Sequence, residues 1–308
     1  MNNQEIVVQN QLARLMGFQI LQNVVNKKQL FDVMDDYIQN HSKVYKRSVS
    51  RDELSVKKWR DGFKDNPFFD DLNSLDIQKY VASRIGSGAA PASVNRELAF
   101  FKAVVKKAED WGVNVPKVKV KFFKEKHKLQ YFSKEETVKL LTSGFYKSNR
   151  RVAHLKTVVM IGIHTGMRRS EILNLKWDQV DFEAKVIRLL ETKSGDEQTV
   201  SMPDLLITYL ESVPKNSPWV ITDYRGLHVK DVKNSFKALL KFEGIFKPGY
   251  TLHTLRHTFA SHLAMAGVSL GVIQDCLRHA DISTTMRYAH ISDQHKRDSV
   301  NKLAEVFH

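Results

Sequence analysis

The chain has 308 residues, of which 42% are hydrophobic and 10% aromatic, a composition that indicates a folded protein and allows two ordinary domains. Its longest apolar stretch, Val158 to Ile163, is too short to span a bilayer, and its first residues lack the layout of a signal peptide. From these two features we expect no membrane association. The single cysteine, Cys276, cannot form an internal disulfide, so we expect a reducing, cytoplasmic location.

The net charge of the chain is +14, from 48 basic and 34 acidic residues. This excess favours a polyanionic partner, and nucleic acid is the first candidate. Charge alone leaves open the alternative of a merely soluble basic protein, and it names no activity.

The first half of the chain predicts a helical domain. Residues 1–28 form a mixed polar and apolar lead with one expected helix, and residues 29–115 carry apolar side chains at helical spacing. The expected core positions are Phe31, Met34 and Ile38 on one helix and Val94, Leu98, Phe101, Val105 and Ala108 on another. We expect Ser93 to cap the second of these helices and Trp111-Gly112 to end it.

A basic linker follows. Residues 116–130 begin with period-two alternation, and the run from Pro116 to Lys128 holds six lysines. We interpret this segment as an extended connection between two domains, which would lie near a DNA backbone if both domains hold DNA.

The second predicted domain spans residues 131–297. Ser133 has the features of a helix cap, and an apolar helix over 153–163 is closed by a His-Thr-Gly sequence. Residues 186–190 and 198–202 are typical of two strands joined by a turn that carries Lys193. The predicted fold is therefore mainly α-helical with a small β-hairpin or sheet.

The segment LHTLRHTFASHLAMAG, from Leu252 to Gly267, is the most informative part of the sequence. Its apolar residues form a core-facing stripe, whereas His253, Arg256 and His257 share another face of the same helix. Imidazole beside guanidinium offers a proton carrier and an anion-binding group in one place. A surface cluster without a role is the alternative when the segment is taken alone.

The two histidines of this helix also have the spacing of a zinc-binding helix. A metalloprotease of the H-E-x-x-H kind needs Glu where this chain has Thr254, and no Cys pair or acidic third ligand lies nearby in sequence. We therefore expect no metal site.

Two further segments carry candidate chemistry. In TGMRRSE, Arg168 follows a glycine turn at the start of a helix, where backbone N–H groups and a guanidinium suit a phosphate oxyanion, and Glu171 could hold Arg168. In STTMRYAH, Ser283 is the expected cap of a short helix that carries Tyr288. Taken alone, such a tyrosine would be an ordinary amphipathic surface residue.

The order of these motifs resembles the catalytic domain of the tyrosine recombinases, the phage integrase family. TGMRRSE, TKSG, HTLRH and an LRH nine residues before Tyr288 follow one another as in that family, over roughly residues 131–292. Residues 30–112 resemble, more weakly, the family's helical, SAM-like core-binding domain. The resemblance implies two domains that form a clamp on DNA.

The resemblance also implies a site and an activity. Tyr288 would be the nucleophile that forms a 3′-phosphotyrosyl link, and Arg168 and Arg256 would hold the phosphate oxygens. Lys193 would protonate the departing 5′-oxygen, His253 would assist proton transfer at the tyrosine, and His279 would hydrogen-bond the phosphate. No cofactor, metal or nucleotide is needed, because the phosphotyrosine keeps the energy of the broken bond.

The expected partners are double-stranded DNA with specific recombination sites and three further copies of the chain, forming a homotetramer on two sites in a bacterial or phage-infected cell. Accessory DNA-bending or directionality proteins are compatible with this scheme. Residues 298–308 predict a tail helix with an apolar stripe, which packs on its own domain or docks into a neighbouring protomer.

Two departures from the family pattern stand out. Members often have Gly where this chain has Arg278, and the basic residue often seen at the start of the catalytic domain is replaced around Leu129-Gln-Tyr131. The alternatives are a type IB topoisomerase, which would relax DNA without recombination, and an inert DNA-binding regulator, which would have lost a catalytic Arg or Tyr. The target sequence and the biological task, whether integration, inversion, transposon transfer or dimer resolution, do not follow from the residues.

Overall fold

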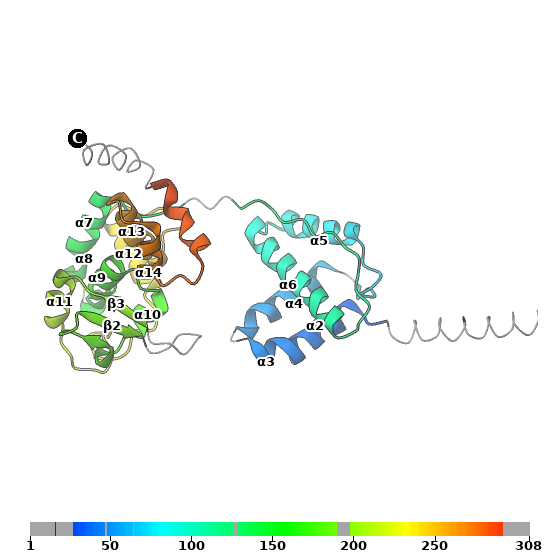
Figure 1. Ribbon diagram of the computed structural model, residues 1–308, viewed down its shortest axis with the longest axis horizontal. Helices are drawn as coiled ribbons and strands as arrows, with labels where there is room; N and C mark the ends of the chain where they lie inside the picture. Colours follow the sequence, from blue (N-terminus) through cyan, green and yellow to red (C-terminus); the bar gives the residue numbers. More distant parts are fainter. Residues whose placement is uncertain are drawn as a thin grey trace, which may run out of the picture. The chain divides into compact units, whose positions relative to one another are not determined.

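A computed structural model describes residues 27–291, apart from 47, 64, 126–128, 149 and 190–197, together with Met16. The chain divides into two compact units, residues 1–127 and 128–308. Figure 1 shows the helices of each unit and the small sheet of the second. None of the described helices is both long and apolar enough to cross a bilayer.

The first unit is helical, as the sequence predicts. Its elements are α2 (Leu30–Tyr37), the π-helical turn η1 (Ile38–Ser42), α3 (Lys43–Tyr45), α4 (Val49–Gly62), α5 (Ser74–Gly86) and α6 (Pro91–Asp110). The expected core positions of α2 and α6 are buried except Val105, which is partly buried.

The start of α6 differs from the prediction. Ala90 is the N-cap and Pro91 occupies the first helical turn, so Ser93 lies inside the helix and caps nothing. Proline begins a helix well because its fixed φ is already helical and its missing N–H would have had no partner there. The end of α6 is as predicted, since Trp111 is the C-cap and Gly112 takes a left-handed φ of +73°.

A buried ion pair lies at the centre of the first unit. Glu97 on α6 accepts hydrogen bonds from the hydroxyl of Tyr80 at 2.6 Å and from the guanidinium of Arg84 at 2.8 Å, both on α5. The Tyr80 ring stacks on Trp59 of α4 with centroids 4.0 Å apart. The carboxylate therefore joins α6 to α5, and the stacked rings join α5 to α4.

Residues 116–125, which we expected to belong to a linker, run along the first unit. Val118, Val120 and Phe123 pack against its core, and Asn95 of α6 exchanges two hydrogen bonds with the backbone of Phe123. The apolar residues that alternate with lysine in this segment are therefore part of the packing of the first unit, and the two units divide after His127.

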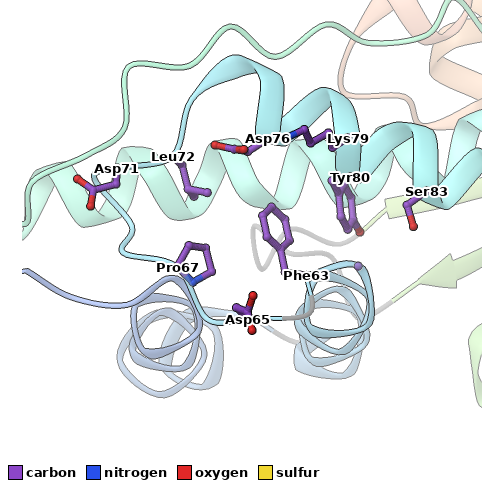
Figure 2. Close-up of a pocket in the computed structure, with 10 residues that line it drawn as sticks. Phe63, Asp65, Pro67, Asp71, Leu72, Asp76, Lys79, Tyr80 and Ser83 are labelled. Carbon is purple, nitrogen blue, oxygen red and sulfur yellow. The ribbon is translucent and has the colours of Figure 1, made fainter.

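The first unit also has a cavity of about 430 Å³, between the end of α4 and the start of α5. Figure 2 shows Phe63 and Tyr80 at this cavity with the carboxylates of Asp71 and Asp76. None of the described residues that were predicted to form the catalytic site lines it.

The second unit is mainly helical with a small sheet, which confirms the predicted fold class. Its helices are α7 (Lys134–Thr142), α8 (Phe145–Ser148), α9 (His154–Thr165), α10 (Arg169–Leu173), α11 (Asp204–Glu211), α12 (Lys233–Phe242), α13 (Leu252–Met265) and α14 (Leu270–Leu277). Its 3₁₀ turns are η2 (Arg150–Val152), η3 (Trp177–Gln179), η4 (Ile282–Thr284) and η5 (Met286–Ile291). Ser133 caps α7 and forms a capping box with Glu136, as its sequence context predicts.

Three antiparallel strands form the sheet in the order β1–β2–β3. They are β1 (Val180–Asp181), β2 (Val186–Leu189) and β3 (Gln198–Ser201), and the sequence analysis missed the first of them. Ile187 pairs with Val180 on one side and Val200 on the other, and all three side chains are buried. The β2–β3 connection, which carries Lys193, lies outside the described residues.

Helices α9 and α13 pack against each other at the centre of the second unit (Figure 1). Helix α10 packs on α9, whereas α14 and η5 pack on α13. This arrangement gathers three predicted motifs, on α10, on α13 and on α14 with η5, the first of which lies far from the other two in the sequence.

We expect Glu97→Ala to destabilise the first unit by about 1–3 kcal/mol, because it leaves the buried Tyr80 hydroxyl and the partly buried Arg84 guanidinium without their shared acceptor. Amide hydrogen exchange in α5 and α6 measures this loss within the full-length chain. Asp110→Ala is the matched control, since Asp110 pairs with Lys107 on the surface of the same helix and its loss should cost less than about 1 kcal/mol. Equal protection in the two variants would contradict the importance of the buried pair.

Candidate active site

Arg256 is a deeply buried member of the predicted site. It lies on α13, which begins at the N-cap Thr251, and only 2% of its surface is exposed. Its Nη1 donates to the carbonyl of Gly166 at 2.7 Å, and its Nη2 donates to the carbonyl of Leu277. These carbonyls end α9 and α14, where a helix leaves acceptors without internal partners. One guanidinium therefore joins three helices.

Arg256 keeps its charge despite this burial. Desolvation, and then repulsion from Arg168 and Arg278, lower its pKa to about 10. A group with that pKa is still protonated at neutral pH. These two hydrogen bonds also leave part of its five N–H donors for an anion.

Gly166 allows the close approach of α9 to α13. Its φ is +62°, and a Cβ atom at this position would lie 2.5 Å from the ring of Phe259. Only glycine fits both the left-handed backbone and this contact. The glycine turn of TGMRRSE is thus needed to bring Arg168 beside α13.

Arg168 is the N-cap of α10 and is held by Glu171, as the sequence suggested. The backbone N–H of Arg168 donates to Glu171 Oε2, and its Nη1 donates to Oε1, both at 2.8 Å. Its Nη2 donates to the carbonyl of Arg278 at 3.0 Å. The side chain of Arg168 remains 43% exposed, so it can reach a ligand from solvent.

His279 follows α14 and is also fixed in place. Its Nδ1 lies 2.8 Å from the hydroxyl of Thr285, which is completely buried. Burial, and then the charges of Arg256 and Arg168, lower the pKa of His279 to about 4. The ring is therefore neutral at neutral pH, and Thr285 is a supporting residue that the sequence analysis did not single out.

Tyr288 lies in η5 and is 1% exposed, so it is not the amphipathic surface residue that the motif suggests when taken alone. The expected cap is wrong: Ser283 lies inside the preceding turn η4, and Asp281 caps that turn by accepting the backbone N–H of Ser283 at 2.8 Å.

The hydroxyl of Tyr288 lies 2.7 Å from Nδ1 of His257. Burial raises the pKa of Tyr288, against the lowering effect of Arg287 and Arg256, and the phenol is protonated at neutral pH. Burial, followed by the charges of His253, Arg287 and Arg256, lowers the pKa of His257 to about 3. A neutral phenol therefore meets a neutral imidazole.

His253 is exposed at the start of α13, one helical turn before His257, with the two ring centroids 4.6 Å apart. The sequence analysis assigned the tyrosine proton to His253, whereas the imidazole within hydrogen-bond distance of the phenol is that of His257. Both histidines stood in the motif, but the helix phase that brings His257 to η5 depends on tertiary packing. Lys193 lies outside the described residues.

The assembled group can bind an oxyanion and present a nucleophile to it. Arg168, Arg256 and Arg278 contribute three positive charges near one carboxylate, that of Glu171, and a buried phenol lies on the neighbouring turn. Arginine suits this task because its planar fork matches two oxygens of a phosphate. Among the residues that the structure describes, no three His, Cys, Asp or Glu side chains gather as metal ligands would.

Comparisons with known proteins identify the family of this chain. Residues 130–295 match the model of the phage integrase family. The chain is 26% identical over 292 residues to a tyrosine recombinase of Thermosipho africanus, covering 89% of this chain and 99% of that protein. It is 34% identical over 237 residues to the integrase of Escherichia phage 186, covering 75% of this chain and 65% of that protein.

Solved structures show the same fold. The integrase of transposon Tn1549, in complex with circular intermediate DNA, superposes with a TM-score of 0.71 at 18% identity and covers 84% of this chain and 94% of that chain. A lambda integrase dimer bound to a core site superposes with a TM-score of 0.69 at 17% identity, covering 88% of this chain and 80% of that chain.

Because the family model covers more than half of the sequence, the chain belongs to the phage integrase family. It is accordingly a tyrosine recombinase, an enzyme of site-specific DNA recombination.

We expect the His257 ring to stay neutral throughout the pH range in which an ordinary histidine titrates. Its pKa is lowered, so the ring gains a proton only near pH 3, instead of near the usual value of about 6.5. NMR titration of the protein with isotope-labelled histidine measures this midpoint, and His257→Gln identifies the signal. A midpoint near the ordinary value would contradict the burial of this ring against Tyr288.

Proposed function

We propose that Tyr288 is the nucleophile of this recombinase and that Arg168, Arg256 and His279 bind the scissile phosphate. The observation that carries the proposal is the contact of the buried Tyr288 hydroxyl with His257 on α13, the residue next in sequence to Arg256. A nucleophile, a proton acceptor and an anion-binding group thus come from one turn of helix and the segment packed on it.

The proposed reaction exchanges one phosphate ester for another. The phenolic oxygen of Tyr288 bonds to phosphorus, the bond from phosphorus to the 5′-oxygen breaks, and the protein remains joined to the 3′-phosphate. The transition state gathers negative charge on the two non-bridging oxygens, which the guanidinium groups of Arg168 and Arg256 neutralise. Rejoining is the reverse attack by a 5′-hydroxyl, so it needs no nucleotide.

Two protons move in this scheme. We assign the proton leaving the Tyr288 hydroxyl to Nδ1 of His257, because that nitrogen lies 2.7 Å from the oxygen. His253, which the sequence analysis favoured for this step, stands one turn away at the exposed end of the helix. Lys193 remains the proposed donor to the 5′-oxygen on the strength of the TKSG motif.

The proposed partner is double-stranded DNA carrying specific recombination sites. The net charge of +14 supports it, as does the DNA in the Tn1549 and lambda integrase complexes. The helical unit would be the core-binding domain, and residues 131–297 the catalytic domain. Recombination of two duplexes needs four strand cleavages, which supports a ring of four copies, with or without accessory DNA-bending proteins, in the cytoplasm of a bacterial cell.

Replacing Tyr288 with Phe should abolish covalent attachment to DNA and leave binding intact, because it removes only the attacking oxygen. The assay is capture of a protein–DNA adduct on a nicked duplex whose site has been selected by binding from a random library. Tyr146→Phe is the matched control, since this tyrosine is also buried and its hydroxyl bonds the carbonyl of Leu140. The Tyr146→Phe protein should still form the adduct, and an adduct that persists in the Tyr288→Phe protein would sink the assignment.

Arg168→Lys and Arg256→Lys should each slow cleavage by about 10²–10³-fold at saturating protein, because a single ammonium cannot reproduce the paired N–H donors at the oxyanion. Arg169→Lys is the control, since Arg169 is adjacent in sequence but pairs with Asp231 at the surface. Chelators should leave all these rates unchanged. A rate for either site variant equal to that of the Arg169 variant would place that arginine outside the reaction.

A further inference from the structure

Arg278 occupies a backbone position that disfavours it. It is the C-cap of α14 with φ +55°, and Lys185 is the other non-glycine residue with positive φ in the described part of the chain. The left-handed region crowds the Cβ atom of every residue except glycine, which adopts it freely. We therefore expect the reason that arginine stands here to lie in the contacts of its side chain, which glycine could not make.

The side chain of Arg278 turns inward onto Glu171. It is only 5% exposed, and its Nη2 donates to Glu171 Oε2 at 2.6 Å. The same carboxylate receives Arg168 through its other oxygen, and the carbonyl of Arg278 receives Nη2 of Arg168. The three residues form a closed ring of hydrogen bonds, in which Arg278 lies 107 positions from Glu171 and 110 from Arg168.

This ring of hydrogen bonds holds Arg168 more firmly than its pair with Glu171 alone would. An isolated pair between Glu171 and the half-exposed Arg168 would contribute little, because water competes for both groups. Arg278 is itself buried, and it bonds a carboxylate whose side chain is only 19% exposed. Water therefore competes less for this bond, and Arg278 fixes the carboxylate in place. Desolvation raises the pKa of Glu171, but the opposite effect of Arg278 and Arg168 is larger. The pKa is therefore lowered overall, and the carboxylate stays charged.

We propose that Arg278 is a positioning residue for the phosphate-binding arginine: through Glu171 and its own carbonyl, it holds the Arg168 guanidinium toward the scissile phosphate. This inference rests on the proposed role of Arg168. It assigns a task to the residue at which the chain departs from its family, where glycine is frequent. Arg278 would not touch DNA, and its effect belongs to the cleavage step, not to binding.

The test uses Arg278→Gly in the full-length protein, because glycine relieves the left-handed backbone and favours folding. We expect single-turnover cleavage of the nicked duplex at saturating protein to fall by about 10- to 100-fold, the usual effect of removing a group that orients a reacting one. The dissociation constant for the half-site should stay within about threefold of the wild-type value. Lys185→Gly is the matched control, since it makes the same kind of exchange at the other left-handed position and should cleave normally.

Two further variants separate positioning from general structure. Arg278→Lys can restore a bond to Glu171 and should recover part of the lost rate. In a Glu171→Gln background, Arg278→Gly should have little additional effect, because the residue through which it acts is already weakened.

Four outcomes would overturn the inference: a cleavage rate for the Arg278→Gly protein within about threefold of wild type, a loss confined to binding, equal defects for Arg278→Gly and Arg278→Lys, or full additivity with Glu171→Gln. Wild-type protein that forms no covalent adduct would instead refute the proposed role of Tyr288, so the two failures are distinguishable. If the Arg278→Gly protein unfolds, the Arg278→Lys protein and its additivity with Glu171→Gln decide the question.

Discussion

The buried guanidinium of Arg256 is the interaction on which the second unit depends. It donates two hydrogen bonds to the last carbonyls of α9 and α14, so the charge that would bind a phosphate also closes the ends of two helices. Burying such a charge is costly unless it is hydrogen-bonded, and the carbonyls at these two helix ends supply the acceptors. The fold and the candidate site therefore share one side chain.

The remaining groups are arranged around this guanidinium at increasing exposure. Tyr288 and Thr285 are buried on the segment that packs against α13, His257 and His279 are partly buried, and Arg168 extends toward solvent. The pKa values of both histidines are lowered, because the rings are desolvated among positive charges. At neutral pH the site thus holds neutral imidazoles and charged arginines, an arrangement that favours an anion between them. Repulsion among the arginines is itself a reason for an anion to bind, since a phosphate relieves it.

The first unit uses the same device on a smaller scale, since the Glu97 carboxylate joins α5 to the helix that carries it. In each unit one buried ionic group forms hydrogen bonds that connect neighbouring helices. Such groups contribute little net stability compared with apolar replacements, but their loss leaves an unpaired charge. Their value here lies in geometry.

Much of this protein was determined by local sequence. Apolar spacing predicted helices in both units, the glycine after α9 and the cap at Ser133 marked their ends, and the motif order led to Arg168, Arg256, His279 and Tyr288 before any geometry was known. Local rules failed at two helix starts: α6 begins at Pro91 instead of after a cap at Ser93, and Ser283 lies inside the turn η4, which Asp281 caps. They also missed the short strand β1, whose two residues carry too little pattern.

Tertiary structure alone decided which groups meet. The sequence contains both histidines of HTLRH, but the packing of η5 against α13 selected His257 as the neighbour of the phenol. Tertiary packing also decided the place of the segment that we expected to be a linker. Its alternate apolar residues pack against the core of the first unit. Arg278 was visible only as a departure from a family pattern. Its contact with Glu171 joins residues more than a hundred positions apart, and no local spacing encodes a contact of that range.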